Sequence, residues 1–495
     1  MKKSLRAILL LALVAALTFN MMMLSSCNLF SSDQEEDDDG ESVYKNVFVA
    51  ALGDKYERLI SIKEPKIAVV GGSSVAFGLN SALIARHLDR EVVNFGLFAT
   101  LGSKIMLDLS EDGLNEGDIV VFAPELDEKT LSLYFGARAA WQAIDASPAL
   151  YDTVWTHNGE ELQAEEESFI EEKKSYKEDG APDPSGVYNR RNFNAYGDIL
   201  YDRPYNTMAL GYDPNTIFDL KPEIMSEDFL AYFNNYCARL REKGITVYFS
   251  FCPINDKSLA EDTTPESLDA MEQYLIDNLN CPVISSIEDY IMDWGYFYDT
   301  NLHLNNAGVT ARTETLINDL RAEMGIPGDV ILDIPEPPGL EGSGAVDGDN
   351  THANLFTYEL MKNGDTVLGA KIVGLSEAAA SFTGKELTIP ASTDDGTPVI
   401  LIEGDVLGGL KTVEKITIGA NIGSMADAAF RGCDALREIH VEFGTECLVS
   451  VPGEKEPAGL MEGAPTGCLI YCDEKYREDF LNHYTWQHYY KYFAK

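Results

Sequence analysis

The stretch Ile67-Ala-Val-Val-Gly-Gly-Ser-Ser74 decides how the first half of the chain folds. Its apolar, β-branched residues predict a buried strand, and the two glycines predict a tight turn directly after it. Such a turn presents the hydroxyl of Ser73 at the carboxyl edge of a sheet, where α/β sheets place their ligands. The same turn can also be a plain strand-to-helix connection, and Ser74 is a rival to Ser73.

Strand-like runs alternate with helix-like runs around this turn. The alternation predicts an α/β fold, a largely parallel sheet with helices on both faces. The expected strands are 67–70, 92–95, 118–123, 245–251 and a short 282–284. The expected helices are 81–88 with Asn80 or Ser81 as cap, one through 106–109, 229–241 and 307–324. Residues 127–225 fit the alternation poorly and are expected to form an insertion, with a cap over the site as one role open to it.

A second stretch, Tyr298-Asp-Thr-Asn-Leu-His-Leu-Asn305, offers an acid and a histidine on one loop before the last of these helices. Serine, histidine and aspartate are the parts of an acyl-transfer site. Between residues 46 and 330 the histidines are His87, His157 and His303. Only His303 follows an aspartate on a loop that leads into a predicted helix. The alternative is a histidine that merely caps the helix. Asp293 and Asn301 are weaker substitutes for Asp299 as its partner.

These motifs resemble the SGNH (GDSL-like) hydrolase superfamily, especially its extracytoplasmic members that handle acyl groups on surface polymers. Gly71-Gly-Ser73 stands where that superfamily has Gly-Asp-Ser, and Asn94-Phe-Gly96 follows the second strand, where the family has a glycine. The resemblance implies a flavodoxin-like parallel sheet over residues 46–328. It implies Ser73 as nucleophile, His303 as base and Asp299 as acid. The N–H groups of Ser73 and Gly96 would be the oxyanion donors.

Two positions depart from the family pattern. The family spaces acid and base as Asp-x-x-His, whereas Asp299 lies four residues before His303. Where the family has a Gly-x-Asn-Asp block after the third strand, this chain has Ala123-Pro-Glu125. A carboxylate donates no hydrogen bond unless it is protonated, and losing such a donor costs about 10²–10³ in rate. Glu125 is either a structural partner at the strand end or a second acid near the site.

The resemblance implies acyl transfer through an acyl-serine, without a cofactor. Water as acceptor makes the protein an esterase, and a sugar hydroxyl makes it an O-acyltransferase, with a carbohydrate or cell-envelope polymer as partner. The alternative is a catalytically inactive scaffold that serves as an adhesin or polymer-binding lipoprotein.

The beginning of the chain is typical of a secreted protein. Basic residues precede an apolar run over 7–19, the order of a signal peptide. Leu24-Ser-Ser-Cys27 looks like a bacterial lipobox, which implies lipidation of Cys27, a signal peptide over 1–27 and an extracytoplasmic protein held at the membrane or cell surface by its lipid only. An uncleaved anchor helix is the alternative. Residues 28–45 are acidic and indicate a solvated tether.

Charge and cysteine content exclude several functions. The net charge of −43 argues against nucleic acid as a partner and against docking on anionic lipid. The eight cysteines do not form a dense disulfide framework, and no Cys-x-x-Cys occurs, so the sequence predicts no metal site.

A Pro/Gly/Asp-rich linker over 329–355 leads to a second module, 356–495. Aligning Val399–Val413 with Ile422–Leu436 reveals a 23-residue repeat, in which Ile402 matches Met425 and Ile416 matches Ile439. A fixed period of this size is typical of a solenoid. The run from Ala428 to Ile439 resembles the BspA-type leucine-rich repeat of bacterial surface proteins, and the aromatic tail through Trp486 looks like its terminal cap. The module is expected either to bind a protein or glycan or to act as a spacer.

Overall fold

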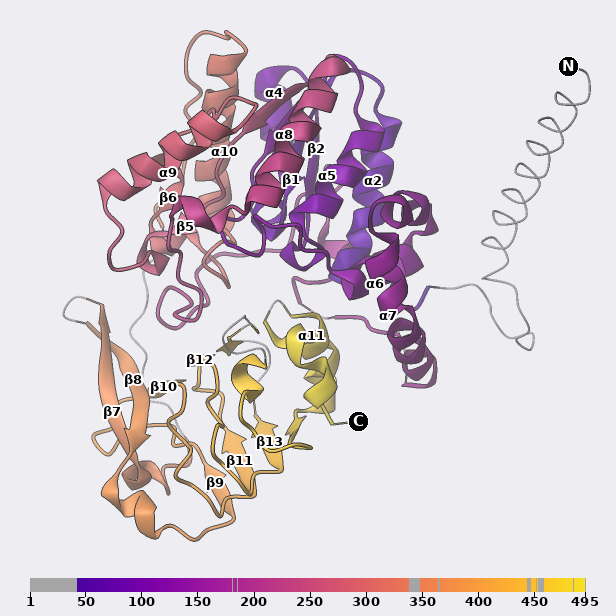
Figure 1. The fold of residues 1–495 in the computed structure, drawn as a ribbon. Coiled ribbons are helices and arrows are strands. Elements are labelled where there is room, and N and C mark those ends of the chain that lie inside the picture. The colour runs from indigo at the N-terminus through magenta and orange to yellow at the C-terminus, as the bar shows by residue number, and fades with distance from the viewer. Residues whose placement is uncertain are drawn as a thin grey trace, which may run out of the picture. The chain divides into compact units, whose positions relative to one another are not determined.

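A parallel sheet of four strands carries the serine turn, in the strand order β2-β1-β3-β4. The computed structural model describes residues 42–179, 181–184, 186–337, 348–363, 366–442, 447–450, 452, 458–483 and 485–494. Cys27 and the expected signal segment lie outside the described residues. The strands of this sheet are β1 (Lys66–Gly71), β2 (Glu91–Gly96), β3 (Ile119–Phe122) and β4 (Thr246–Phe249). The protein is therefore a mixed α/β protein that contains parallel sheets and helices (Figure 1).

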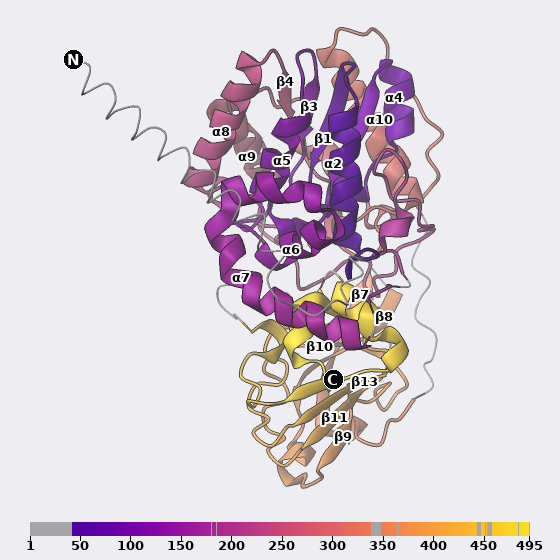
Figure 2. The ribbon, with the colours of Figure 1, turned by 90° about the vertical axis from the view of Figure 1, so that its right-hand side faces the viewer.

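Helices cover both faces of this sheet, as the alternation of strands and helices predicted. Successive side chains of β1 point to opposite faces, so that Ile67 and Val69 enter one apolar cluster and Ala68 and Val70 another. The first cluster includes residues of α4 (Ser81–Leu88) and α10 (Asn306–Glu323). The second includes residues of α2 (Ala51–Ser61), α5 (Ser103–Gly113) and α8 (Glu227–Glu242), and the two sets of helices are visible in Figure 2.

The predicted elements are confirmed within a few residues, with one reduction. Asn80 caps α4, since its side chain accepts a hydrogen bond from the backbone N–H of Leu83 at 3.1 Å. The short strand expected at 282–284 is reduced to a single parallel bridge between Val283 and Phe249. This part also contains α9 (Pro265–Asn278) and three short elements, α3 (Ser73–Ala76), β5 (Ile254–Asn255) and β6 (Ile291–Met292).

The insertion over 127–225 forms two helices followed by irregular chain. The helices are α6 (Ala137–Ala146) and α7 (Tyr151–Asp179), the latter kinked at Asn158. Trp141 of α6 stacks on Phe169 of α7, with 5.4 Å between ring centroids. The irregular chain after α7 brings Tyr188 and Arg203 beside the loop that carries His303.

The C-terminal module consists of two sheets. One has the order β14-β12-β10-β8-β7 and the other β15-β13-β11-β9. Their strands are β7 (Phe356–Asn363), β8 (Thr366–Leu375), β9 (Glu386–Thr388), β10 (Val399–Ile402), β11 (Lys415–Ile418), β12 (Ser424–Met425), β13 (Glu438–Val441), β14 (Leu448–Val449) and β15 (Leu469–Tyr471). Strands β7 and β8 pair antiparallel and the other pairs are parallel. Ile402 pairs with Met425 and Ile416 with Ile439, so the predicted 23-residue offset is the register of these strands.

The aromatic tail packs against the end of this module. The tail contains α11 (Arg477–Asn482) and a 3-10 helix, Trp486–Tyr492. Trp486 is fully buried and donates its ring N–H to the carbonyl of Cys447 at 2.7 Å. Val43–Lys495 together form one compact unit.

Candidate active site

The turn after β1 passes close to neighbouring groups at both of its glycines. A Cβ atom at Gly71 would lie 2.5 Å from the carbonyl oxygen of Ala123, and one at Gly72 would lie 2.2 Å from a carboxyl oxygen of Glu125. A side chain at Gly71 would clash with the backbone, whereas one at Gly72 would displace the carboxyl end of the Glu125 side chain. The chain therefore passes close to the end of β3 before α3 begins at Ser73, which holds the serine at the carboxyl edge of the sheet.

Three predicted residues from distant parts of the chain form one line of hydrogen bonds. Ser73 Oγ lies 2.8 Å from His303 Nε2, and His303 Nδ1 lies 2.8 Å from Asp299 Oδ1. The imidazole thus has one ring nitrogen on the serine hydroxyl and the other on a carboxylate. This is the arrangement in which a histidine can remove a proton from a serine.

The loop that holds Asp299 and His303 absorbs the extra residue between them. Its ends are joined by an antiparallel bridge between Phe297 and Leu304, and the N–H of Tyr298 donates to the carbonyl of His303 at 2.8 Å. Inside the loop, the hydroxyl of Thr300 accepts the N–H of His303 at 3.1 Å. The loop is thereby closed on itself, and the four-residue spacing still brings the acid to the far ring nitrogen.

Asp299 is held in its charged form. Burial alone would raise its pKa, but His303 and the hydroxyl of Tyr188 reverse that effect, and the pKa lies below its usual value. Tyr188 donates to Asp299 Oδ2 at 2.7 Å, so each oxygen of the carboxylate has a partner. A buried carboxylate needs such partners because an unpaired charge is costly to bury.

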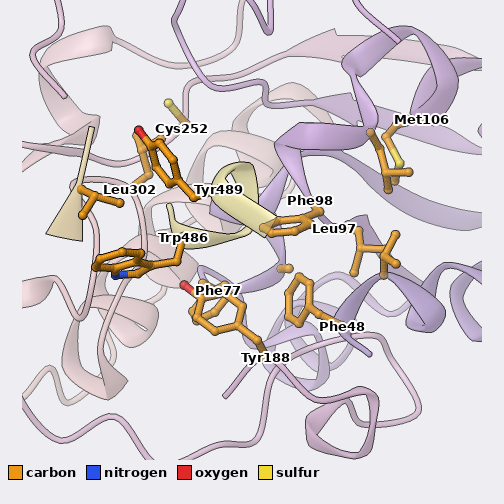
Figure 3. Packing of buried hydrophobic residues seen from close by; sticks show 14 of the residues in the cluster. Phe48, Phe77, Leu97, Phe98, Met106, Tyr188, Cys252, Leu302, Trp486 and Tyr489 are labelled. Carbon is orange, nitrogen blue, oxygen red and sulfur yellow. The ribbon is translucent and has the colours of Figure 1, made fainter. Parts of the chain in front are cut away.

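Aromatic rings fix the plane of the imidazole. The ring of Phe77 stacks on His303 with 3.8 Å between centroids and 4° between planes. Phe77 and Tyr188 are themselves in contact and belong to one buried cluster with Trp486 of the tail (Figure 3). Rotation of the imidazole away from Ser73 would require this packing to open.

Glu125 lies at the end of β3 and supports the serine turn. Its Oε1 accepts the N–H of Ser74 at 2.8 Å, while its Oε2 is buried without a hydrogen-bond partner among the described residues. Burial raises the pKa of the Glu125 carboxyl, against the opposing effect of that N–H. The sequence left two roles open for Glu125, a structural partner and a second acid. Its contact with Ser74 is of the structural kind.

The second expected oxyanion donor is engaged elsewhere. The N–H of Gly96 donates to Asn94 Oδ1 at 3.1 Å, and Asn94 Nδ2 donates to the carbonyl of Val75 and to Asp198. Gly96 would have to give up this acceptor to bind an oxyanion. Its role therefore remains a prediction.

The remaining candidates lie apart from the serine–histidine pair. His157 lies 3.6 Å from a carboxyl oxygen of Asp108, and Asp293 caps the short helix that follows it. Asn301 binds backbone groups of Asp213 and Thr216. Ser74 is buried with no hydrogen-bond partner for its hydroxyl among the described residues. Ser73 is the serine that contacts His303.

The structure adds two residues that the sequence did not indicate. Tyr188 comes from the insertion and contacts Asp299, as described above. His483 comes from the tail of the C-terminal module, and its ring meets Tyr188 edge-on at 5.4 Å. Neither residue belongs to a local motif, so no signal in the sequence marks it.

Among the described residues there is neither a cluster of metal ligands nor a helix that could span a membrane. No group of three or more His, Cys, Asp or Glu side chains there is placed to hold a metal ion. None of the helices described is both long and apolar enough to cross a bilayer.

No family model matches the chain, and no curated protein matches it. Among solved structures, it is similar to a leucine-rich repeat protein from Bacteroides capillosus ATCC 29799, with 15% identity and a TM-score of 0.17, covering 24% of this chain and 95% of that one. It is also similar to a leucine rich cell surface protein from Faecalibacterium prausnitzii A2-165, with 17% identity and a TM-score of 0.15, covering 29% of this chain and 35% of that one. Scores this low assign neither a fold nor an activity to the whole chain.

Proposed function

We propose that this protein is a serine esterase or O-acyltransferase of the SGNH type that acts on an acylated polysaccharide or another cell-envelope polymer. The line of hydrogen bonds from Ser73 through His303 to Asp299 carries the proposal. The strand order β2-β1-β3-β4, with Ser73 directly after β1, agrees with the flavodoxin-like sheet that the resemblance implies.

The reaction follows from the contacts of these three residues. His303 Nε2 takes the proton of Ser73 Oγ as that oxygen attacks the ester carbonyl, and the N–H of Ser73 stabilises the oxyanion. The C–O bond to the alcohol then breaks, and the proton on His303 passes to the leaving oxygen. In the second half, water or a sugar hydroxyl loses its proton to His303 and attacks the acyl carbonyl. The bond between the acyl carbon and Ser73 Oγ then breaks, Oγ takes the proton back from His303, and the acid or the new ester leaves. Asp299 stabilises the imidazolium in both halves.

The C-terminal module supports a polymer as substrate. We infer that it is a leucine-rich repeat solenoid, from its 23-residue register and its resemblance to the BspA-type repeat. A cleft of about 780 Å³ on this module is lined by Lys415, His440, Tyr471 and Lys475, among others. The rings of His440 and Tyr471 stack there at 4.8 Å and 9°. Such a cleft can accommodate a glycan or a peptide. Lipidation at Cys27 would hold the protein at the cell surface, where such polymers lie.

The alternative is a binding scaffold without catalysis, an adhesin or polymer-binding lipoprotein. Two observations favour it: Ser73 is only 1% exposed, and the N–H of Gly96 is engaged with Asn94. Binding would then rest on the C-terminal module alone.

Labelling with a fluorophosphonate tests the proposal, because this probe reacts with activated serines. The full chain, purified in detergent, is compared with its Ser73→Ala and His303→Ala variants. Ser74→Ala is the matched control, since it removes the neighbouring hydroxyl. Labelling that survives in Ser74→Ala and disappears in the other two variants supports the enzyme. If no protein is labelled above the level seen in Ser73→Ala, the proposed enzyme is refuted and the scaffold is favoured.

A further inference from the structure

The candidate site is closed in this structure. Ser73 and His303 are each 1% exposed. An ester carbonyl must come within about 3–3.5 Å of the attacking oxygen before it can react. A polymer-borne ester therefore needs a conformation in which some covering segment has moved.

The tail of the C-terminal module lies against the residues that surround the site. The His483 ring meets Tyr188, the residue that donates to Asp299. Burial lowers the pKa of His483 to about 4; Asp299 opposes this effect and His303 adds to it. Farther along the tail, Tyr490 lies under the guanidinium of Arg138, 4.4 Å from it, which ties the tail to the insertion.

The same module makes a second contact with the catalytic half, on the chain around residue 210. Asn215 Nδ2 donates to Ser424 Oγ at 2.8 Å. Leu448 joins a small buried cluster with Met208, Phe297 and Leu304, and Leu304 follows His303 directly in the chain. The module thus contacts the catalytic half at two places near the histidine loop.

These contacts are of the kind that can open. They combine the hydrogen bond between Asn215 and Ser424 with apolar clusters that join Leu448 to Leu304, Leu210 to Leu401 and Tyr188 to Trp486. Interfaces between modules of one chain commonly allow relative motion. The closed state also leaves no member of the catalytic line unpaired, since Ser73, His303, Asp299 and Tyr188 are bonded in series. Closure therefore protects the site without distorting it.

We propose that the C-terminal module is a reversible lid over Ser73, and that an acylated polymer reaches the nucleophile only when this module has moved away. The proposal rests on the proposed function. It gives the module a role beyond adhesion, because the same body that binds polymer would control access to the site.

A disulfide across the second contact tests the lid. A Cβ atom at Gly423 would lie 2.8 Å from the Cβ of Ala209. Disulfides join Cβ atoms about 3.8 Å apart, so a shift of about 1 Å in the exposed chain at Ala209 accommodates one. The Ala209→Cys/Gly423→Cys variant is oxidised, cross-linking is verified by mass spectrometry, and fluorophosphonate labelling is timed before and after reduction. The single Gly423→Cys variant, treated identically, is the control.

The lid predicts that oxidation slows labelling at least tenfold and that reduction restores it, with no change in the single variant. Equal rates in the two redox states overturn the lid, and so does failure of the cross-link to form. Absence of labelling in the wild-type chain and in the reduced variant refutes the proposed enzyme itself, which is a different result.

A non-covalent variant gives a second reading. Asn215→Ala removes the hydrogen bond to Ser424 without touching the catalytic residues. If the closed state dominates, the open fraction and the labelling rate rise about two- to tenfold, the factor that corresponds to one hydrogen bond. An unchanged rate contradicts the lid.

Discussion

Removing the hydroxyl of Tyr188 is expected to destabilise the protein most at neutral pH. The Tyr188→Phe variant keeps the ring and its packing but leaves Asp299 Oδ2 without the donor that lies 2.7 Å away. A hydrogen bond to a charged group contributes about 1.5–3 kcal/mol, so we expect a loss of about 2 kcal/mol in the free energy of unfolding at pH 7.

The pH dependence follows from the direction of the Asp299 shift. Its pKa in the folded protein lies below the usual value of 3.8. The stability that Asp299 contributes is therefore present above its unfolded pKa and is lost as the pH falls through its folded pKa. In Tyr188→Phe the folded pKa is lowered less, so this contribution is smaller. The difference between the two proteins should be full at pH 7 and shrink on the acid side of pH 3.8.

Urea titrations of the two proteins at pH 7 and at successive acid pH values measure this difference. The matched control is Tyr358→Phe, whose hydroxyl donates to the neutral carbonyl of Ala353 at 2.8 Å. It should cost about 1 kcal/mol at every pH. If the loss of unfolding free energy in Tyr188→Phe is as independent of pH as that in Tyr358→Phe, the assignment of a charged Asp299 as acceptor is refuted. The hydrogen bond from Tyr188 to Asp299 can also become stronger as the His303 imidazolium forms. If this gain is about 1 kcal/mol, labelling of Ser73 in Tyr188→Phe slows about fivefold.

Three further substitutions probe the site and the sheet. Phe77→Leu removes the ring stacked on His303. A cation over an aromatic face gains about 0.5–2 kcal/mol, so losing the ring beside the His303 imidazolium should slow labelling about two- to thirtyfold. An unchanged labelling rate contradicts this role of Phe77. Glu125→Gln should be more stable than the wild-type protein at pH 7 but not at pH 4. Burial raises the pKa of the Glu125 carboxyl, so the wild-type protein loses stability as the pH rises above the unfolded pKa of this group. Urea midpoints of both proteins at the two pH values test this expectation. Lys66→Met leaves the buried Asp118 without its cation at 2.6 Å and should cost about 3–5 kcal/mol, measured as a lower urea midpoint. Partial recovery is expected in the double variant with Asp118→Leu, and no recovery would contradict a buried ion pair.

Local patterns predicted those parts of the molecule in which neighbours along the chain determine the conformation. The apolar run at 67–70 predicted the strand and its glycines predicted the turn, since a Cβ atom at Gly71 would clash with the backbone of Ala123. In the C-terminal module, the 23-residue period became the strand register directly, because equivalent residues of successive repeats pair side by side.

The parts that could not be predicted depend on contacts between distant segments. Tyr188 lies 111 residues before Asp299 in the chain, and the polar insertion that carries it shows no periodicity that would aim one side chain at the site. The Asp299–His303 spacing looked unfavourable because a motif counts residues, whereas the loop is closed by Thr300 and by the bridge between Phe297 and Leu304. Such closure is a property of the folded loop and not of its spacing.

The burial of the hydrogen-bonded line from Ser73 to Asp299 links these unpredicted features to one another. A carboxylate, an imidazole and a hydroxyl can be buried together only if each polar atom finds a partner, and a partner for the second oxygen of Asp299 had to come from outside the sheet. The insertion supplies it as Tyr188, and the tail of the C-terminal module packs His483 against that same tyrosine. If the module moves away, water reaches Tyr188 and can compete for Asp299, so opening both admits substrate and loosens the acid. The labelling rate of an opened variant would then depend on Tyr188 less strongly than that of the wild-type chain, because water can replace the tyrosine hydroxyl on Asp299, and a double-mutant cycle between Asn215→Ala and Tyr188→Phe would measure that coupling.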